Sequence, residues 1–337
     1  MLWISWERHR RTRQLAQVLG AILVEHTSES PQLLRYLVLS WRTWRSVATV
    51  RPRILIVQNP SMFLTLLASL LKPLYGYSLV VDRHTNFMIN KQDSPLKRVF
   101  VAVSNFTIRR SDLTIVTNRP LAELVSGVGG RPFVLPDRIP DWRHDTMFRE
   151  HADGLHCVCF VCTYASDEPY DVVFAAAVGL PPNIRLYVTG RPPKGGLPYA
   201  LRQLLESTPQ IVITGYLSDE QYEGLINCSE VVMDLTTMDH CLVCGAYEAI
   251  AAGKPLILSD KQANRALFGD CAIYVENNDA GSIRAGILAG LANTESHAHN
   301  VRAFRDSYTI YWESQLAALK SVLTPDKTAH LSPRATE

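Results

Sequence analysis

Short apolar segments alternate with longer helix-like segments along almost the whole of this 337-residue chain. Apolar runs such as 54–58 and 256–258 predict strands, and segments such as 31–50 and 219–227 have helical character. Repeated strand–helix units build a parallel sheet that helices cover on both faces. The polar segment 136–154 holds two prolines and interrupts this alternation before a second series begins. The sequence therefore predicts an α/β fold with two domains.

The interruption sets the domain boundaries that we expect. Residues 1–140 form a first domain, 141–154 the linker and 155–300 a second domain. The segment 301–323 is apolar enough to pack as a C-terminal helix. The final residues, 324–337, are expected to form a disordered tail.

The segment 235–260 carries the most specific pattern in the chain. It contains a polar loop, a helix of small residues, a stop at Gly253 and Pro255, and an apolar strand. Glu248 is the acidic residue of that helix and is expected near its start. A carboxylate and unsatisfied backbone N–H groups at one helix N-terminus can together hold a ribose hydroxyl and a phosphate. An ordinary helix–strand unit of a parallel sheet would show the same outline, and that alternative stays open.

This segment resembles the donor-binding signature of glycosyltransferases with the two-domain GT-B fold, chiefly family 4. Those enzymes carry a Glu, seven residues, a second Glu, a small-residue helix and Gly-x-Pro. The matching residues here are Glu248, Ala249, Ala251, Gly253 and Pro255. The resemblance implies two Rossmann-like domains facing a cleft, with the C-terminal helix crossing back to the first domain. It also implies that Glu248 binds the nucleotide ribose; the position of the first Glu holds His240.

The resemblance further implies that four segments of the second domain hold the donor nucleotide. Their residues are His240, Cys244, Gly245, Ala246, Glu248, Thr163, Tyr164, Arg191, Gly215 and Tyr216. The loop that begins at Thr163, together with Arg191, would face the diphosphate. The turn at Gly215 and Tyr216 would contact the base, although ordinary turn chemistry explains that glycine equally well.

The stretch Asp82-Arg83-His84-Thr85-Asn86 follows a predicted strand and resembles the Asp-x-His segment of some family-4 and lipid-linked mannosyltransferases. His84 is the candidate general base, because the pKa of a free imidazole lies near neutrality. Asp82 could orient the imidazole. The alternative is a histidine satisfied by the local network at the end of the strand.

The loop after the first strand is rich in basic and aromatic residues. Its resemblance to the corresponding GT-B loop implies that Trp6, His9, Arg10 and Arg11 contact the acceptor. Arg10 and Arg11 lie at an expected helix start, where the helix dipole disfavours cations. That cost favours anion binding or a positional role over the alternative of a solvated basic turn.

Charge is distributed unevenly between the two halves. Residues 1–150 hold 21 Lys/Arg and 11 Asp/Glu, a net charge of +10, and the remainder holds 13 and 21, a net charge of −8. A basic first half favours an anionic partner, for which anionic lipid, a pyrophosphate-linked acceptor or nucleic acid would each fit. Basic and aromatic residues together on the helix 31–50 favour the lipid surface. A solvated basic face is the alternative.

No uninterrupted apolar run reaches the ~18 residues of a membrane-spanning helix, and the N-terminus lacks the features of a signal peptide. We therefore expect a cytoplasmic protein, peripheral to the inner face of the membrane. Cys241 and Cys244 form a C-x-x-C that lacks a second ligand pair at zinc spacing, so no metal is predicted.

The predicted activity is metal-independent transfer of a hexose from a UDP- or GDP-linked sugar, which is a co-substrate rather than a cofactor. The acceptor would be a lipid-linked or other anionic glycan in glycan or polysaccharide biosynthesis, with no nucleic acid involved. Two alternatives stay open: a sugar-nucleotide epimerase of the same fold, and a catalytically silent homologue that binds a sugar nucleotide or a partner enzyme.

Overall fold

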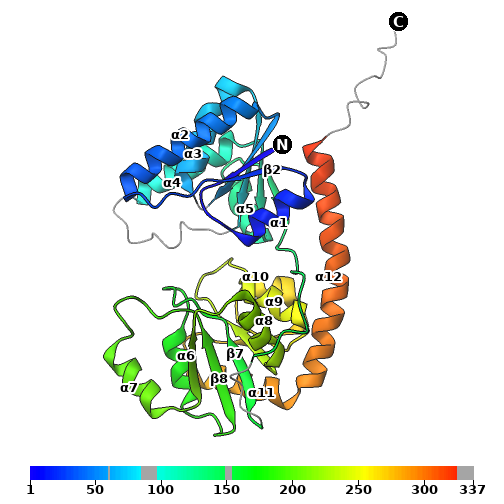
Figure 1. The fold of residues 1–337 in the computed structure, drawn as a ribbon. Coiled ribbons are helices and arrows are strands. Elements are labelled where there is room, and N and C mark those ends of the chain that lie inside the picture. Colours follow the sequence, from blue (N-terminus) through cyan, green and yellow to red (C-terminus); the bar gives the residue numbers. More distant parts are fainter. Residues whose placement is uncertain (60, 85–96, 149–153, 325–337) are drawn as a thin grey trace, which may run out of the picture. The chain divides into compact units, whose positions relative to one another are not determined.

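A computed structural model describes residues 1–59, 61–84, 97–148 and 154–324 (Figure 1). The expected disordered tail, 324–337, lies outside the described residues except for its first member. Among the described residues, no helix has the length and hydropathy that crossing a bilayer requires.

The chain divides into two compact units. The first unit contains residues 1–137 and those from 310 onward, and the second contains residues 138–309. The division therefore falls within the polar segment 136–154 that interrupts the sequence pattern.

Within the described residues, the first unit holds a six-stranded parallel sheet in the order β2-β1-β3-β4-β5-β6. Its strands are β1 (Leu2–Ser5), β2 (Ile22–Glu25), β3 (Ile54–Asn59), β4 (Ser78–Arg83), β5 (Leu113–Val116) and β6 (Pro132–Val134). Its helices are α1 (Arg10–Val18), α2 (Gln32–Val50), α3 (Met62–Tyr75), α4 (Lys97–Arg110) and α5 (Arg119–Gly127). The strand order reverses between β1 and β3, because the chain adds β2 on one side of β1 and β3 on the other.

The core of the first unit explains why its strands contain apolar runs. Leu2, Leu55 and Leu79 from three neighbouring strands pack with Val47 of α2 and Leu64 of α3, and all five are buried. Helix α3 also packs against both α2 and α4, so these three helices form one layer (Figure 1). Right-handed crossovers that advance in one direction place successive helices on the same face of a sheet.

The second unit holds another six-stranded parallel sheet among its described residues, in the order β12-β11-β10-β7-β8-β9. Its strands are β7 (His156–Phe160), β8 (Ile184–Thr189), β9 (Ile211–Gly215), β10 (Val231–Asp234), β11 (Leu256–Ser259) and β12 (Ala272–Val275). Its helices are α6 (Tyr170–Ala177), α7 (Tyr199–Ser207), α8 (Asp219–Cys228), α9 (Cys244–Ala252), α10 (Gln262–Phe268) and α11 (Ala280–Ala292). This is the strand order of dinucleotide-binding Rossmann domains, with its reversal between β7 and β10.

The predicted linker is partly held by the second unit. Trp142 Nε1 donates to Asn227 Oδ1 over 2.7 Å, and the Asn227 amide donates to the Arg143 carbonyl over 2.8 Å. The side chain of Arg143 also reaches Glu223 of α8 over 2.5 Å. The described part of 141–154 is therefore bound along α8 rather than free in solution.

The last helix, α12 (Thr294–Leu323), begins seven residues before the expected position 301. It starts in the second unit, and its final part belongs to the first. There the Trp312 Nε1 donates to the Pro136 carbonyl over 3.0 Å, and the indole is buried. The prediction that the C-terminal helix returns to the first domain is confirmed.

Candidate functional site

In open α/β sheets, ligands bind beyond the carboxyl ends of the strands, where the strand order reverses. In the first unit this point lies between β1 and β3, and in the second between β7 and β10. Most of the residues predicted from the sequence follow strands near one of these two points. Each unit is described in turn.

Arg11, the second residue of α1, is buried between two carboxylates. Its guanidinium donates to Asp82 over 3.1 Å, to Asp137 over 2.5 Å and to the Leu135 carbonyl over 2.9 Å. Burial alone would raise the pKa of Asp82, but the Arg11 charge and neighbouring His84 hold that pKa below its ordinary range. Arg11 thus ties α1 to β4 and to the chain after β6. Its predicted contact with an acceptor stays a prediction, and these ion pairs also give it a positioning role.

His84 and Asp82, the predicted catalytic pair, lie together at the end of β4. The His84 Nδ1 is 3.8 Å from Asp82 Oδ2, and the imidazole is stacked on that of His9 with centroids 4.6 Å apart. Burial, followed by the nearby His84, lowers the pKa of His9 to about 4, so His9 is neutral at pH 7. Thr85 and Asn86, which complete the predicted segment, lie outside the described residues.

Three polar side chains near this reversal retain hydrogen-bonding capacity. Within the described residues, the Nδ1 atoms of His9 and His84 and both amide atoms of Asn59 are buried without a hydrogen-bond partner. Buried polar groups are normally satisfied, so such atoms are candidates for contact with a ligand. Asn59 ends β3 and was not predicted as a site residue, although an amide at the end of an apolar run is the sequence signal for it.

The loop after β1 is fastened to the first unit by its own side chains. Gln58 Nε2 donates to Glu7 Oε1 over 2.8 Å, and the Ser5 hydroxyl donates to the Glu7 carbonyl over 2.6 Å. The Trp6 indole N–H donates to Thr43 of α2 over 2.8 Å. Trp6 therefore packs on α2 and has its polar atom satisfied there, whereas Arg10 is exposed. Their predicted acceptor contacts stay predictions.

In the second unit, Glu248 lies on α9 and has a half-buried partner. The Tyr222 hydroxyl of α8 donates to Glu248 Oε2 over 2.5 Å. Burial and the Glu248 charge raise the pKa of Tyr222 well above its usual value, so the phenol remains a proton donor. Glu248 is the fifth residue of the nine-residue α9 rather than a residue of its first turn, which corrects the expectation from the sequence.

The N-terminus of α9 already has one carboxyl partner. The N–H of Gly245 donates to Asp234 Oδ2 over 2.8 Å, and a Cβ on Gly245 would lie 2.5 Å from that same oxygen. Burial raises the pKa of Asp234 well above its ordinary range, and nearby Glu168 and Glu248 add to this effect. Gly245 is therefore required by the close approach of Asp234. Beside it, Ala246 is buried and Cys244 is exposed at the first helical position.

The loop after β7 is folded around the carboxylate of Glu168. The backbone N–H groups of Thr163 and Ala165 donate to Glu168 Oε2 over 2.8 and 2.9 Å, and the Thr163 hydroxyl donates to Oε1 over 2.9 Å. Tyr164, between them, adopts a left-handed backbone with φ of 60° and is buried. An anion is thus already present on the amides that were predicted to face the donor diphosphate. This role of Glu168 was not predicted from the sequence.

Two other predicted donor residues lie close together after strands β8 and β9. The Arg191 guanidinium lies 5.2 Å from the centre of the Tyr216 ring, and Tyr216 is exposed. Gly215, with φ of 70°, forms a bridge to Gly190. Arg191 and Tyr216 together present a cation and an aromatic ring to solvent. His240 lies in the loop between β10 and α9 with a left-handed backbone, φ of 63°.

Comparison with known proteins clarifies the fold. Neither a protein-family model nor a curated protein matches the chain. Sucrose-phosphate synthase from Thermosynechococcus elongatus is 14% identical, has a TM-score of 0.77, and is matched over 96% of this chain and 98% of its own. Anabaena HepE in complex with UDP and glucose is 12% identical, with a TM-score of 0.72 and coverages of 96% and 92%.

A third solved structure is WaaG, a glycosyltransferase involved in lipopolysaccharide biosynthesis. It is 12% identical, has a TM-score of 0.68, and is matched over 97% of this chain and 100% of its own. These likenesses and the two Rossmann-like units show that the chain has the GT-B glycosyltransferase fold. The predicted fold class is confirmed.

Proposed function

We propose that this protein is a glycosyltransferase that transfers a hexose from a UDP- or GDP-linked sugar. The observation that carries the proposal is the GT-B fold, matched over nearly the full length of the chain. HepE, which shares that fold, has been solved with UDP and glucose and also with UDP-glucose. Glu248 lies on the helix that follows the strand-order reversal of the second unit, where a nucleotide is expected to bind.

The donor is held, in this proposal, by the second unit. Glu248 accepts a ribose hydroxyl, with Tyr222 fixing the carboxylate through its 2.5 Å hydrogen bond. Arg191 offers a positive charge to the diphosphate, and the Tyr216 ring beside it offers a surface for the base. Stabilisation of the departing nucleoside diphosphate by fixed dipoles and charge would favour the transition state.

The acceptor is activated, in this proposal, by the first unit. His84 accepts the proton of the attacking hydroxyl, and Asp82, ionised and buried, stabilises the imidazolium that forms. The stacked His9 is neutral at pH 7 and so does not repel the acquired charge. Asn59 is positioned at the end of β3 to orient an acceptor hydroxyl through its amide.

The acceptor is proposed to be lipid-linked, because one helical layer of the first unit suits an anionic bilayer. The sequences of α2, α3 and α4 contain eight Lys or Arg and no Asp or Glu. Leu37, Trp41, Phe63 and Leu74 are each at least half exposed on α2 and α3. Basic and large apolar side chains together favour binding to a surface of anionic lipids.

A catalytically silent sugar-nucleotide-binding protein is the second candidate. The occupation of the Thr163–Ala165 amides by Glu168 favours it, because a donor phosphate would meet a carboxylate there. The buried Asp234 and the nearby Asp167 add acidic groups to the same end of the sheet. Both candidate functions require nucleotide binding, and only the transferase would turn over a sugar nucleotide.

The test is release of UDP or GDP from a panel of UDP- and GDP-linked sugars by the purified full-length protein. Turnover supports the transferase, and binding without turnover supports the silent protein. In a His84→Ala variant, loss of the general base is expected to reduce turnover by about 10²–10⁴-fold with unchanged donor affinity. Exposed His144→Ala is the matched control. Absence of nucleotide binding to the wild-type protein would contradict both proposals.

A further inference from the structure

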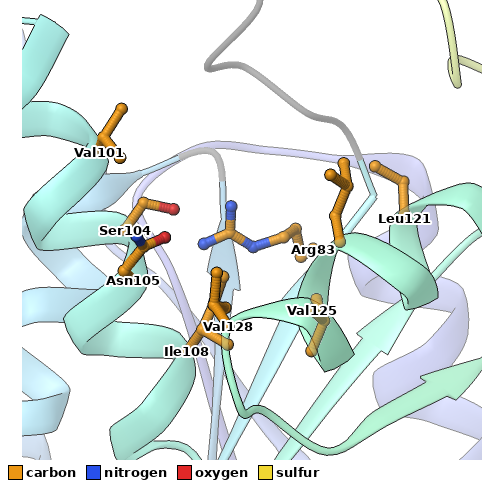
Figure 2. A pocket seen from close by; sticks show the side chains of 9 residues that line it. Arg83, Val101, Ser104, Asn105, Ile108, Leu121, Val125 and Val128 are labelled. Atoms are coloured by element: carbon orange, nitrogen blue, oxygen red, sulfur yellow. The ribbon is translucent and has the colours of Figure 1, made fainter.

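Arg83 faces away from the candidate catalytic pair. Successive side chains of a strand point to opposite faces, so Asp82 faces α1 while Arg83 faces the helices on the other side. The side chain enters a hollow of about 180 Å³ between α4 and α5 (Figure 2). This hollow, the Arg83 pocket, is separate from the residues assigned above to donor or acceptor chemistry.

The inner end of the Arg83 pocket is polar and positively charged. Arg83 is only 4% exposed, and burial lowers the pKa of its guanidinium to about 10, which leaves it charged at pH 7. The Ser104 hydroxyl and the Asn105 amide on α4 point toward the guanidinium (Figure 2). Guanidinium, hydroxyl and amide groups can all donate to one anion.

The remaining walls of the pocket are apolar. Leu121 and Val125 of α5 are almost fully buried, and Ile108 of α4 is 6% exposed. Val101 and Leu124 are also part of the lining and are exposed to solvent, so the pocket opens between α4 and α5. A cavity of roughly 150 Å³ lined by such side chains accommodates benzene. The Arg83 pocket therefore has room for a short apolar chain and not for a nucleotide.

We propose that the Arg83 pocket binds an amphipathic anion, with its carboxylate or phosphate at Arg83, Ser104 and Asn105 and its apolar chain against Leu121, Leu124 and Val125. Charge-assisted hydrogen bonds favour the anionic head, and apolar burial favours the chain. Helix α4 also belongs to the basic, acid-free layer α2–α4, so the opening lies beside a surface suited to anionic lipids. This site does not depend on the proposed transferase activity.

The test is calorimetric titration of the full-length protein with octanoate, octyl phosphate and octanol. Saturable binding of one equivalent is expected for the octanoate or octyl phosphate arm, and the tighter arm identifies the preferred head group. Octanol should bind at least about tenfold more weakly, because it lacks the charged hydrogen bonds. Arg83→Gln should weaken the binding of the anion by about tenfold or more.

Two further variants separate the pocket from general effects of charge and folding. Leu124→Trp adds volume at a position that is 48% exposed, so the fold should survive while the pocket is filled and anion binding is lost. Arg110→Gln removes an exposed charge from the same helix and should leave binding unchanged. Absence of saturable binding by both anions would overturn the proposal. Equal binding by wild type and a folded Leu124→Trp variant would also overturn it.

Discussion

Glu248 is the residue on which donor recognition is proposed to depend most. Glu248→Ala should weaken UDP or GDP binding by about 1–3 kcal/mol, the range for loss of a charged hydrogen bond. Tyr222→Phe keeps the carboxylate and removes only its 2.5 Å partner, so a smaller loss is expected. Calorimetry on both variants provides the measurement. Unchanged affinity in a folded Glu248→Ala protein would remove the residue from the donor site.

Glu168 is expected to have the opposite effect on the same ligand. Glu168→Gln removes a negative charge from the amides of Thr163 and Ala165, which should raise the affinity for UDP or inorganic pyrophosphate. Two unit charges about 4 Å apart interact by about 1 kcal/mol when water screens them fully, so the affinity should rise by at least about fivefold. Glu206→Gln, an exposed change of the same charge in the same unit, is the control. Tighter binding in both variants, or in neither, would contradict the role given to Glu168.

At the scale of elements, the layer α2–α4 should act as one binding surface. Tyr36 of α2 contacts Phe63 of α3 with ring centroids 4.4 Å apart, and α3 packs against α4. We expect co-sedimentation with anionic but not with neutral vesicles, weakening as salt screens the charges. Replacing Arg35, Arg42 and Arg45 together by Gln should cost about 1 kcal/mol per charge. Equal recovery in the supernatant with both vesicle types at low salt would refute the surface.

The strands could be predicted from the sequence, whereas one short helix could not. Strands such as Ile54–Asn59 begin with an unbroken apolar run because helices cover both faces of their sheet, and that run predicted them well. Helix α10 was missed, because seven residues are too short for helical periodicity to be distinguished.

The site was predictable where it depends on local chain geometry. Asp82 and His84 are two residues apart at a strand end, and they lie on one side of the sheet together. The burial of Arg11 was not predictable, because its partner Asp137 is 126 residues away. Nor could the pattern show that Glu168 binds its own loop, which requires the left-handed backbone at Tyr164.

At the scale of the molecule, α12 is the element that the two units share. Trp312 is buried and lies in the C-terminal part of α12. Trp312→Ala should lower the free energy of unfolding of the first unit by about 3–5 kcal/mol, the usual cost of removing a buried Trp. Trp312→Phe keeps a six-membered aromatic ring, and it loses the pyrrole part of the indole together with the hydrogen bond to the Pro136 carbonyl, so a smaller cost of at least about 1 kcal/mol is expected. The exposed Ile310→Ala on the same helix is the control.

Hydrogen exchange measured by peptide mass spectrometry would locate the effect of Trp312→Ala. Peptides covering β1 and β3 should lose protection, because Trp312 belongs to their unit, whereas those covering β7 and β10 should keep it. Donor affinity should likewise survive, since Glu248 and Tyr222 lie in the second unit. Equal loss of protection in both sets of peptides would mean that the two units unfold as one cooperative body, and α12 would then stabilise the whole molecule rather than the first unit.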